Sequence, residues 1–159
     1  MRPLLTLLLA FWNVAVFRLR PQDLPRSNVL LVVTAVANVG ISLAISAVLD
    51  MPAINASVEM CVLVGMTVTL LYAFARSARI VQTLTALLGA SAVIGLVVAV
   101  LVVMFPNLPY PVRIAIFMWN MFVIAHVLRH ALDTLFVLGC LIAFAYALTL
   151  DSLLRLLLG

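Results

Sequence analysis

The feature that most constrains this chain is a series of five long apolar segments, separated only by short polar or proline-containing turns. The segments are residues 29–49, 53–75, 80–105, 112–132 and 134–150. A helix rises about 1.5 Å per residue, so about 20 residues cross the roughly 30 Å hydrocarbon core of a bilayer. The chain is 67% hydrophobic and 9% charged, whereas a soluble domain is about 25% charged. The sequence therefore predicts an all-α polytopic transmembrane helix bundle, with five spans within residues 29–159.

Residues 1–20 form a further apolar run that is too short to span a membrane. If these residues form a helix, with 100° per residue, four polar side chains fall within one sector of about 40°: Arg2, Thr6, Asn13 and Arg20. A narrow polar stripe on an apolar helix is typical of an amphipathic helix that lies in the membrane interface. A helix packed on the bundle is the alternative, and the pattern leaves both open. Residues 21–28, PQDLPRSN, are predicted to form a polar elbow before the first span.

All nine basic residues are arginines, and their distribution predicts an orientation. If the N-terminus is cytoplasmic, only Arg113 and Arg155 lie in outer segments. The inner segments hold Arg2, Arg18, Arg20, Arg26, Arg76, Arg79 and Arg129. Because cytoplasmic loops carry the excess of arginine, we expect a multi-pass protein of the bacterial inner membrane with a periplasmic C-terminus. The arginines are scattered between apolar spans and form no basic stripe, so nucleic acid is not an expected partner.

Glu59 is a carboxylate predicted to lie inside a span, about six residues or 9 Å from the outer surface. A charge at that depth is costly and should face the bundle interior or a water-filled cavity. Arg113, at the outer end of the fourth span, is predicted to pair with it. The structural interpretation is an ion pair that fixes helix register. The functional interpretation is a proton or ion site in a small transporter or channel.

Two further patterns concern contacts between helices. Asn38 and Asn120 fall near the middle of their spans, where interhelical amide hydrogen bonds fix helix pairing. Small residues spaced by four let membrane helices approach closely. Such spacing occurs in Ser42 with Ser46 and in the series Gly139, Ala143, Ala147.

The end of the fourth segment concentrates polar side chains on one helical face: His126, Arg129, His130 and Asp133. We predict a patch that faces a partner or anionic lipid, in which Asp133 accepts a bond from Arg129 and caps the fifth span. In the alternative, His126 and His130 bind a metal or haem, as in a membrane enzyme. No P-loop, GxSxG, HExxH or CxxC motif occurs. We therefore predict no catalytic residue and no cofactor.

Two stretches carry a family resemblance. FRLRPQDLPRS at 17–27 precedes the first span, and WN at 119–120 with HVLRHALD at 126–133 lies in the fourth. Together with the five closely spaced spans, they resemble the Ypt-interacting-protein (Yip) domain family and its bacterial relatives. That resemblance implies a cytoplasmic N-terminus, an outward C-terminus and a role in membrane organisation or partner binding. We therefore expect a non-enzymatic scaffold or accessory subunit that binds another membrane protein, a second copy of itself or membrane lipid.

Overall fold

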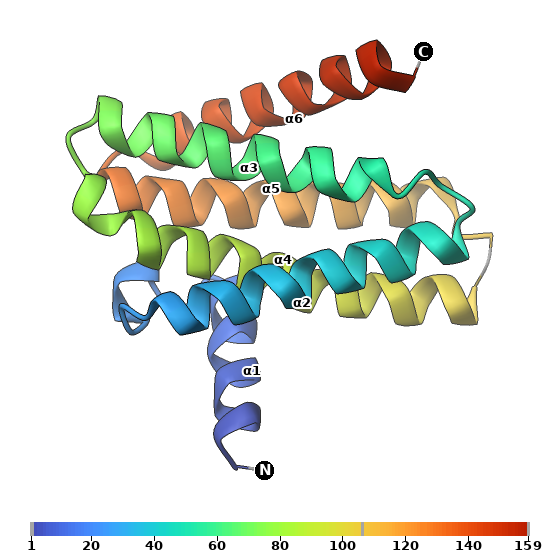
Figure 1. The fold of residues 1–159 in the computed structure, drawn as a ribbon, viewed down its shortest axis with the longest axis horizontal. Coiled ribbons are helices and arrows are strands. Elements are labelled where there is room, and N and C mark those ends of the chain that lie inside the picture. The colour runs from blue at the N-terminus through green and yellow to red at the C-terminus, as the bar shows by residue number, and fades with distance from the viewer. Residues whose placement is uncertain (1, 106, 159) are drawn as a thin grey trace.

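The fold is a bundle of long antiparallel helices, seen in a computed structural model that describes residues 2–105 and 107–158 (Figure 1). Over these residues there are six α-helices, two short 3-10 helices and no strand. They are α1 (Arg2–Ala15), η1 (Pro21–Asp23), α2 (Asn28–Val48), α3 (Ile54–Ala73), η2 (Ser77–Arg79), α4 (Ile80–Met104), α5 (Tyr110–Leu132) and α6 (Phe136–Leu158). Helices α2 to α6 are long and apolar enough to cross a membrane. This confirms the predicted all-α membrane bundle.

The helix boundaries differ from the predicted spans chiefly at the C-terminus. The fifth span was expected to end at residue 150, but α6 continues to Leu158. Neither glycine nor proline interrupts residues 150–158. The Nε of Arg155 also donates to Asp151 Oδ2 at 2.8 Å, one turn apart on the same helix. Such a pair stabilises an exposed helix end, so the helix has no local reason to stop earlier.

Four helices end in turns that contain no glycine. Each turn has one residue in the left-handed region: Phe17, Asp50, Ala75 and Asp133, with φ between 54° and 64°. The next N–H then donates to a carbonyl five residues earlier, in the pairs Arg18–Asn13, Met51–Ser46, Arg76–Leu71 and Thr134–Arg129. This Schellman arrangement satisfies the last carbonyls of a helix, and glycine usually fills the left-handed position. The α5–α6 turn therefore forms at Asp133 without the residue types that usually mark a turn.

Helix α4 is the centre of the bundle and contacts α1, α2, α3 and α5. Every residue from 82 to 90 is buried. Helix α6 packs on α3 and α5, on the side of the bundle away from α1 (Figure 1). At Gly139 the backbones of α6 and α5 come so close that an added Cβ would lie 2.5 Å from the Ala125 oxygen. The small residue predicted at this position is therefore needed for the contact.

Helix α1 runs across the direction of the other helices and projects from the bundle (Figure 1). Its C-terminal end packs on the bundle, where the Phe11 ring lies against Gly89 of α4. The Trp119 indole of α5 donates to the Ala15 carbonyl at 2.9 Å. Residues 11–15 are thus packed on the bundle, as in the alternative to an interfacial helix, and they contact α4 and α5 near the middle of each helix. The leucines farther along α1 are about half exposed or more: Leu5, Leu8 and Leu9.

The two ends of the bundle differ in charge. One end, here called the arginine-rich end, gathers η1, η2 and the α5–α6 turn (Figure 1). Its arginines are Arg18, Arg20, Arg26, Arg76, Arg79 and Arg129. The other end, here called the α2–α3 end, holds the α2–α3 and α4–α5 turns and the C-terminus. Arg113 and Arg155 lie toward this end, so the fold separates eight of the nine arginines as predicted. The exception is Arg2, which begins the projecting helix α1 and does not lie at the arginine-rich end.

Candidate functional site

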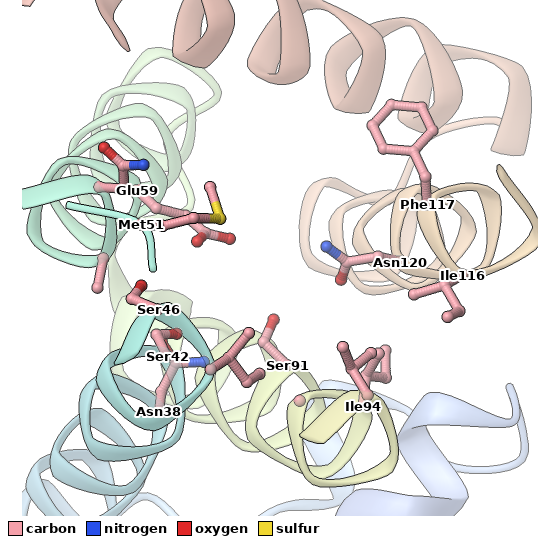
Figure 2. Close-up of a pocket in the computed structure, with 15 residues that line it drawn as sticks. Asn38, Ser42, Ser46, Met51, Glu59, Ser91, Ile94, Ile116, Phe117 and Asn120 are labelled. Carbon is pink, nitrogen blue, oxygen red and sulfur yellow. The ribbon is translucent and has the colours of Figure 1, made fainter. Parts of the chain in front are cut away.

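A polar cavity of about 280 Å³ lies inside the bundle, between α2, α3, α4 and α5 (Figure 2). Seven polar side chains line it: Asn38, Ser42, Ser46, Asn55, Glu59, Ser91 and Asn120. Polar groups inside membrane spans are costly and mark functional or structural sites. One water occupies about 30 Å³ in the liquid, so the cavity has room for several waters or a small ligand. It is the candidate functional site of this chain.

Helix periodicity places these side chains on the inner faces of their helices. Asn38, Ser42 and Ser46 are spaced by four on α2, so they share one face. Asn55 and Glu59 are also four apart, on the first turns of α3. Ser42 and Ser46, predicted to be a close helix contact, line the cavity instead. The sequence shows the repeated spacing of four, but it does not show which helices face each other across these residues.

Glu59 carries the negative charge of the cavity. Figure 2 shows its carboxylate and the amide of Asn120 directed into the hollow from opposite sides. The Glu59 side chain is exposed on the isolated chain and lines the cavity. Within the described residues, no ion pair involves Glu59. Its charge is therefore available to a ligand in the cavity.

The predicted pair of Glu59 with Arg113 does not form between these described residues. Arg113 lines a neighbouring cavity of about 450 Å³, which shares Val98 and Ile116 with the first. Its Nε donates to the Leu108 carbonyl at 3.2 Å. This bond holds the guanidinium beside the α4–α5 turn, while the carboxylate of Glu59 faces the bundle interior. The prediction of an ion pair is wrong, because similar depth in the membrane does not ensure that two side chains face each other.

Several oxygen atoms of the cavity have no protein partner. Asn55 Oδ1 and Asn120 Oδ1 are buried without a hydrogen bond. In the described part of the chain, the hydroxyls of Ser42, Ser46 and Ser91 also make no hydrogen bond to protein. By contrast, Asn38 Nδ2 bridges α2 to α4 by donating to the Leu88 carbonyl at 3.5 Å. Asn38 thus forms an interhelical bond of the kind predicted, whereas the oxygen of Asn120 is left for water or a ligand.

Toward the arginine-rich end, the three helices that carry Glu59, Ser91 and Asn120 continue with apolar side chains of the hydrophobic core. Leu63 of α3, Leu87 of α4 and Ile124 of α5 are 6%, 0% and 2% exposed. Each lies about one turn or less from a polar residue of the cavity on its own helix, toward the arginine-rich end. The polar surface therefore reaches from the middle of the bundle toward the α2–α3 end, on one side of an apolar layer.

The chemistry of this cavity is that of an oxygen-rich site with one negative charge. A carboxylate, amide oxygens and hydroxyls are the groups that coordinate hard cations. Within residues 2–105 and 107–158, no group of three or more His, Cys, Asp or Glu side chains gathers closely enough to hold a metal ion. The oxygen set is therefore that of a weakly charged site, suited to a monovalent cation or a protonated small molecule.

The second predicted site is the patch of His126, Arg129, His130 and Asp133 at the arginine-rich end. In the structure, these four residues do not form one patch. Asp133 Oδ2 lies 3.0 Å from both Arg76 Nη2 and Arg79 Nη1. The predicted bond between Asp133 and Arg129 is therefore wrong, because the α3–α4 turn brings two other arginines to the carboxylate. The hydrogen bond from Arg79, with the positive charges of Arg79 and Arg76, holds the pKa of Asp133 below its ordinary value.

The His126 ring binds the segment between α1 and α2, and His130 lies beside it. His126 is 7% exposed, and its Nε2–H donates to the Leu19 carbonyl at 3.3 Å. Its ring lies 4.7 Å from that of His130, whose Nε2 accepts from Arg129 Nε at 3.3 Å. His126 is thus inside the protein and does not belong to an exposed patch. Arg129 and His130 remain half-buried, and Asp133 is exposed on the side of η2.

Two glutamines that sequence reasoning missed join the same segment to the bundle. Gln82 of α4 is 9% exposed, and its Nε2 donates to the carbonyls of Leu24 at 2.8 Å and Gln22 at 3.2 Å. Its Oε1 accepts from Arg26 Nε at 3.2 Å. Gln22 Nε2 in turn donates to the His130 carbonyl at 2.5 Å. A long polar side chain in an otherwise apolar span was the available signal for Gln82.

Comparisons with protein-family models, with curated proteins and with solved structures return no significant match to this chain.

Proposed function

We propose that this membrane protein is a small transporter that binds a monovalent cation in the polar cavity, with Glu59 as the charged ligand. The observation that carries the proposal is the position of Glu59. Its carboxylate faces a cavity of about 280 Å³ and has no ion-pair partner among the described residues. An unpaired carboxylate at membrane depth is costly, and a bound cation or proton removes that cost.

The neutral groups of the cavity support the same ligand class. The buried oxygens of Asn55 and Asn120 lack protein partners, and each offers lone pairs to a cation. One carboxylate with several neutral oxygens balances a single positive charge. A divalent ion would keep an excess positive charge in a low-dielectric bundle. A monovalent cation, a proton or a small protonated molecule is therefore the best match.

The shape of the cavity supports transport better than a continuous pore. The apolar layer of Leu63, Leu87 and Ile124 separates the polar cavity from the arginine-rich end. A site that is polar toward one end and sealed toward the other corresponds to one state of an alternating-access cycle. We place the arginine-rich end in the cytoplasm of a bacterial cell, following the arginine distribution. The cavity is then on the periplasmic side of the seal.

The first test is cation-dependent stability of the full chain in detergent. We expect one of Na⁺, K⁺ or Li⁺, at constant ionic strength with choline, to raise the thermal unfolding temperature. Glu59→Gln should abolish the rise. Asp50→Asn is the matched control, because it removes one carboxylate at the α2–α3 end without touching the cavity and keeps a residue that tolerates the left-handed conformation.

The second test measures movement across a membrane. Proteoliposomes should take up the stabilising cation, or their lumen should acidify when a proton gradient is imposed. Glu59→Gln should reduce the rate of uptake or acidification to that of vesicles without protein. An unaltered rate or an unaltered thermal shift in Glu59→Gln would contradict the proposal. A response to no monovalent cation and no proton gradient would also contradict it.

A scaffold function, the role expected from the sequence and from the Yip resemblance, is the second candidate. It is favoured by one observation: α1 projects from the bundle with Leu5, Leu8 and Leu9 exposed (Figure 1). We propose that this ridge packs on another membrane protein. Purification in mild detergent should then co-isolate one partner at constant stoichiometry. A triple Leu→Ser change at the ridge should release that partner, and retention would count against this role.

A further inference from the structure

A groove on the outer surface of α5 and α6 has an apolar part and a charged part. The apolar part has a volume of about 420 Å³, and its walls include Met118, Met121, Val137, Leu141 and Phe144. Phe122 belongs to this part and also to a second hollow of about 450 Å³ nearer the α5–α6 turn. The two hollows are therefore neighbours along the seam between the helices, with Phe122 as their shared wall.

The second hollow carries a cation at its rim. It is lined by Phe17, Phe122, His126, Arg129 and Phe136. The guanidinium carbon of Arg129 lies 5.7 Å from the centre of the Phe136 ring. The Arg129 Nε donates to His130, but the two terminal nitrogens make no hydrogen bond or ion pair within the described residues. The two terminal nitrogens of the planar guanidinium, with their four N–H donors, thus remain open at the groove.

No carboxylate lines either hollow. The nearest acidic residue along the chain, Asp133, is bound by Arg76 and Arg79 on the other side of the turn. Asp23 accepts a bond from the Arg20 backbone N–H at 3.0 Å. The charged part of the groove is therefore complementary to an anion.

The length of the groove corresponds to one leaflet of a bilayer. Phe117 lines the apolar part and Arg129 the charged part. They are separated by about 12 residues of one helix, or about 18 Å at 1.5 Å per residue. Half of a hydrocarbon core is about 15 Å thick. An acyl chain laid along the seam therefore reaches from its headgroup at Arg129 to about the middle of the membrane.

We propose that this groove binds an anionic phospholipid, with the phosphate on the terminal nitrogens of Arg129 and one acyl chain along the α5–α6 seam. Arginine recognises phosphate through two parallel hydrogen bonds from its planar fork. Phe17 comes from the segment between α1 and α2, so the lipid also contacts that segment. The site shares Phe117 with the lining of the Glu59 cavity but includes none of that cavity's polar residues, so the lipid proposal does not rest on the cation proposal.

Cys140 provides a direct probe, because it lies in the wall of the apolar part. In a Cys61→Ser background, Cys140 carries the single thiol of the chain. Phosphatidylglycerol added to protein in a neutral detergent should slow maleimide labelling of Cys140. At a lipid concentration ten times Kd the slowing should be about tenfold, because only the unoccupied fraction reacts. Phosphatidylcholine with the same acyl chains and glycerol phosphate without chains should slow it far less.

Arg129→Gln should weaken phosphatidylglycerol protection by about tenfold or more, as expected for losing charged hydrogen bonds to phosphate. Arg18→Gln removes the same charge at the same end from an exposed side chain outside the groove, and should keep the protection. Val137→Trp, which fills the apolar part, should abolish protection while Arg129 remains. A circular dichroism spectrum like that of the parent confirms that each variant is folded.

Three results would overturn the lipid site. Equal protection by phosphatidylcholine would show no preference for an anionic headgroup. Equal protection by glycerol phosphate would show an anion site with no acyl chain. Equal protection in Arg129→Gln and Arg18→Gln would show that the lipid covers Cys140 without binding Arg129.

Discussion

Arg79 Nη1 lies 3.0 Å from Asp133 Oδ2, and this ion pair ties the α3–α4 turn to the α5–α6 turn. The same nitrogen donates to the backbone oxygens of His130 at 3.2 Å and Ala131 at 3.0 Å. These carbonyls belong to the last turn of α5, where no intrahelical N–H reaches them and a cation is favoured. Arg79 therefore closes the end of α5 as well as pairing with a carboxylate.

The first prediction separates these two roles by comparing Arg79, the last residue of η2, with Arg76, the residue that precedes η2. Arg79→Gln should lower the free energy of unfolding by about 1–2 kcal/mol, since helix-end carbonyls lose their donor as well as the ion pair. Arg76→Gln removes the same charge but only the more exposed contact with Asp133, and should cost at most about 0.5 kcal/mol. Unfolding in a denaturing detergent measures both. Equal losses would mean that the carbonyl bonds of Arg79 contribute nothing.

The second prediction concerns pH and Asp133. Its pKa is lower in the folded protein than in the unfolded chain, chiefly because of the hydrogen bond from Arg79. The ion pair therefore stabilises the fold above the unfolded-state pKa of about 3.9, and this stability is lost as pH falls through the lower folded-state pKa. The unfolding temperature of the wild type should exceed that of Asp133→Asn at pH 6, and the difference should shrink below pH 4. Asparagine tolerates the left-handed backbone, so a constant difference would point to backbone strain instead.

The third prediction tests the close approach of α5 and α6. A Cβ at Gly139 meets the backbone oxygen of Ala125 at 2.5 Å, and backbone cannot move aside as a flexible side chain can. Gly139→Ala should therefore destabilise the protein by about 1–3 kcal/mol, as overpacking does. Gly65→Ala on α3 is the control, because nothing lies within 4 Å of its added Cβ. The control should be neutral or more stable by up to about 1 kcal/mol, since alanine favours helix.

The fourth prediction concerns Gln82, which fastens the segment between α1 and α2. Gln82→Leu leaves the carbonyls of Leu24 and Gln22 without their donor and should cost about 1–3 kcal/mol. Trypsin should then cleave after Arg18 more rapidly, whereas Arg20 is followed by Pro21 and is resistant to trypsin. Thr85→Val, whose hydroxyl bonds only the Val81 carbonyl of its own helix, should leave the cleavage rate unchanged. An unaltered rate in Gln82→Leu would show that the histidine and tryptophan bonds suffice to hold the segment.

The five spans followed from the sequence because the membrane imposes a length and a composition on each crossing helix. Proline and polar residues marked three of the four turns between them, and the α5–α6 turn was predicted only because a single helix would have been too long. Asp133 supplies the left-handed residue at that turn, a role that glycine usually fills and that a sequence pattern therefore does not reveal.

Which side chains face each other was decided by the tertiary structure alone. Glu59 was predicted to meet Arg113 from their similar depths, yet each lines a different cavity. In a soluble helix, the apolar stripe shows which face turns inward. In these spans both faces are apolar, so hydropathy leaves the rotation of each helix undetermined. Packing around α4 fixed those rotations, and in doing so it gathered Asn38, Glu59 and Asn120 from three helices into one cavity.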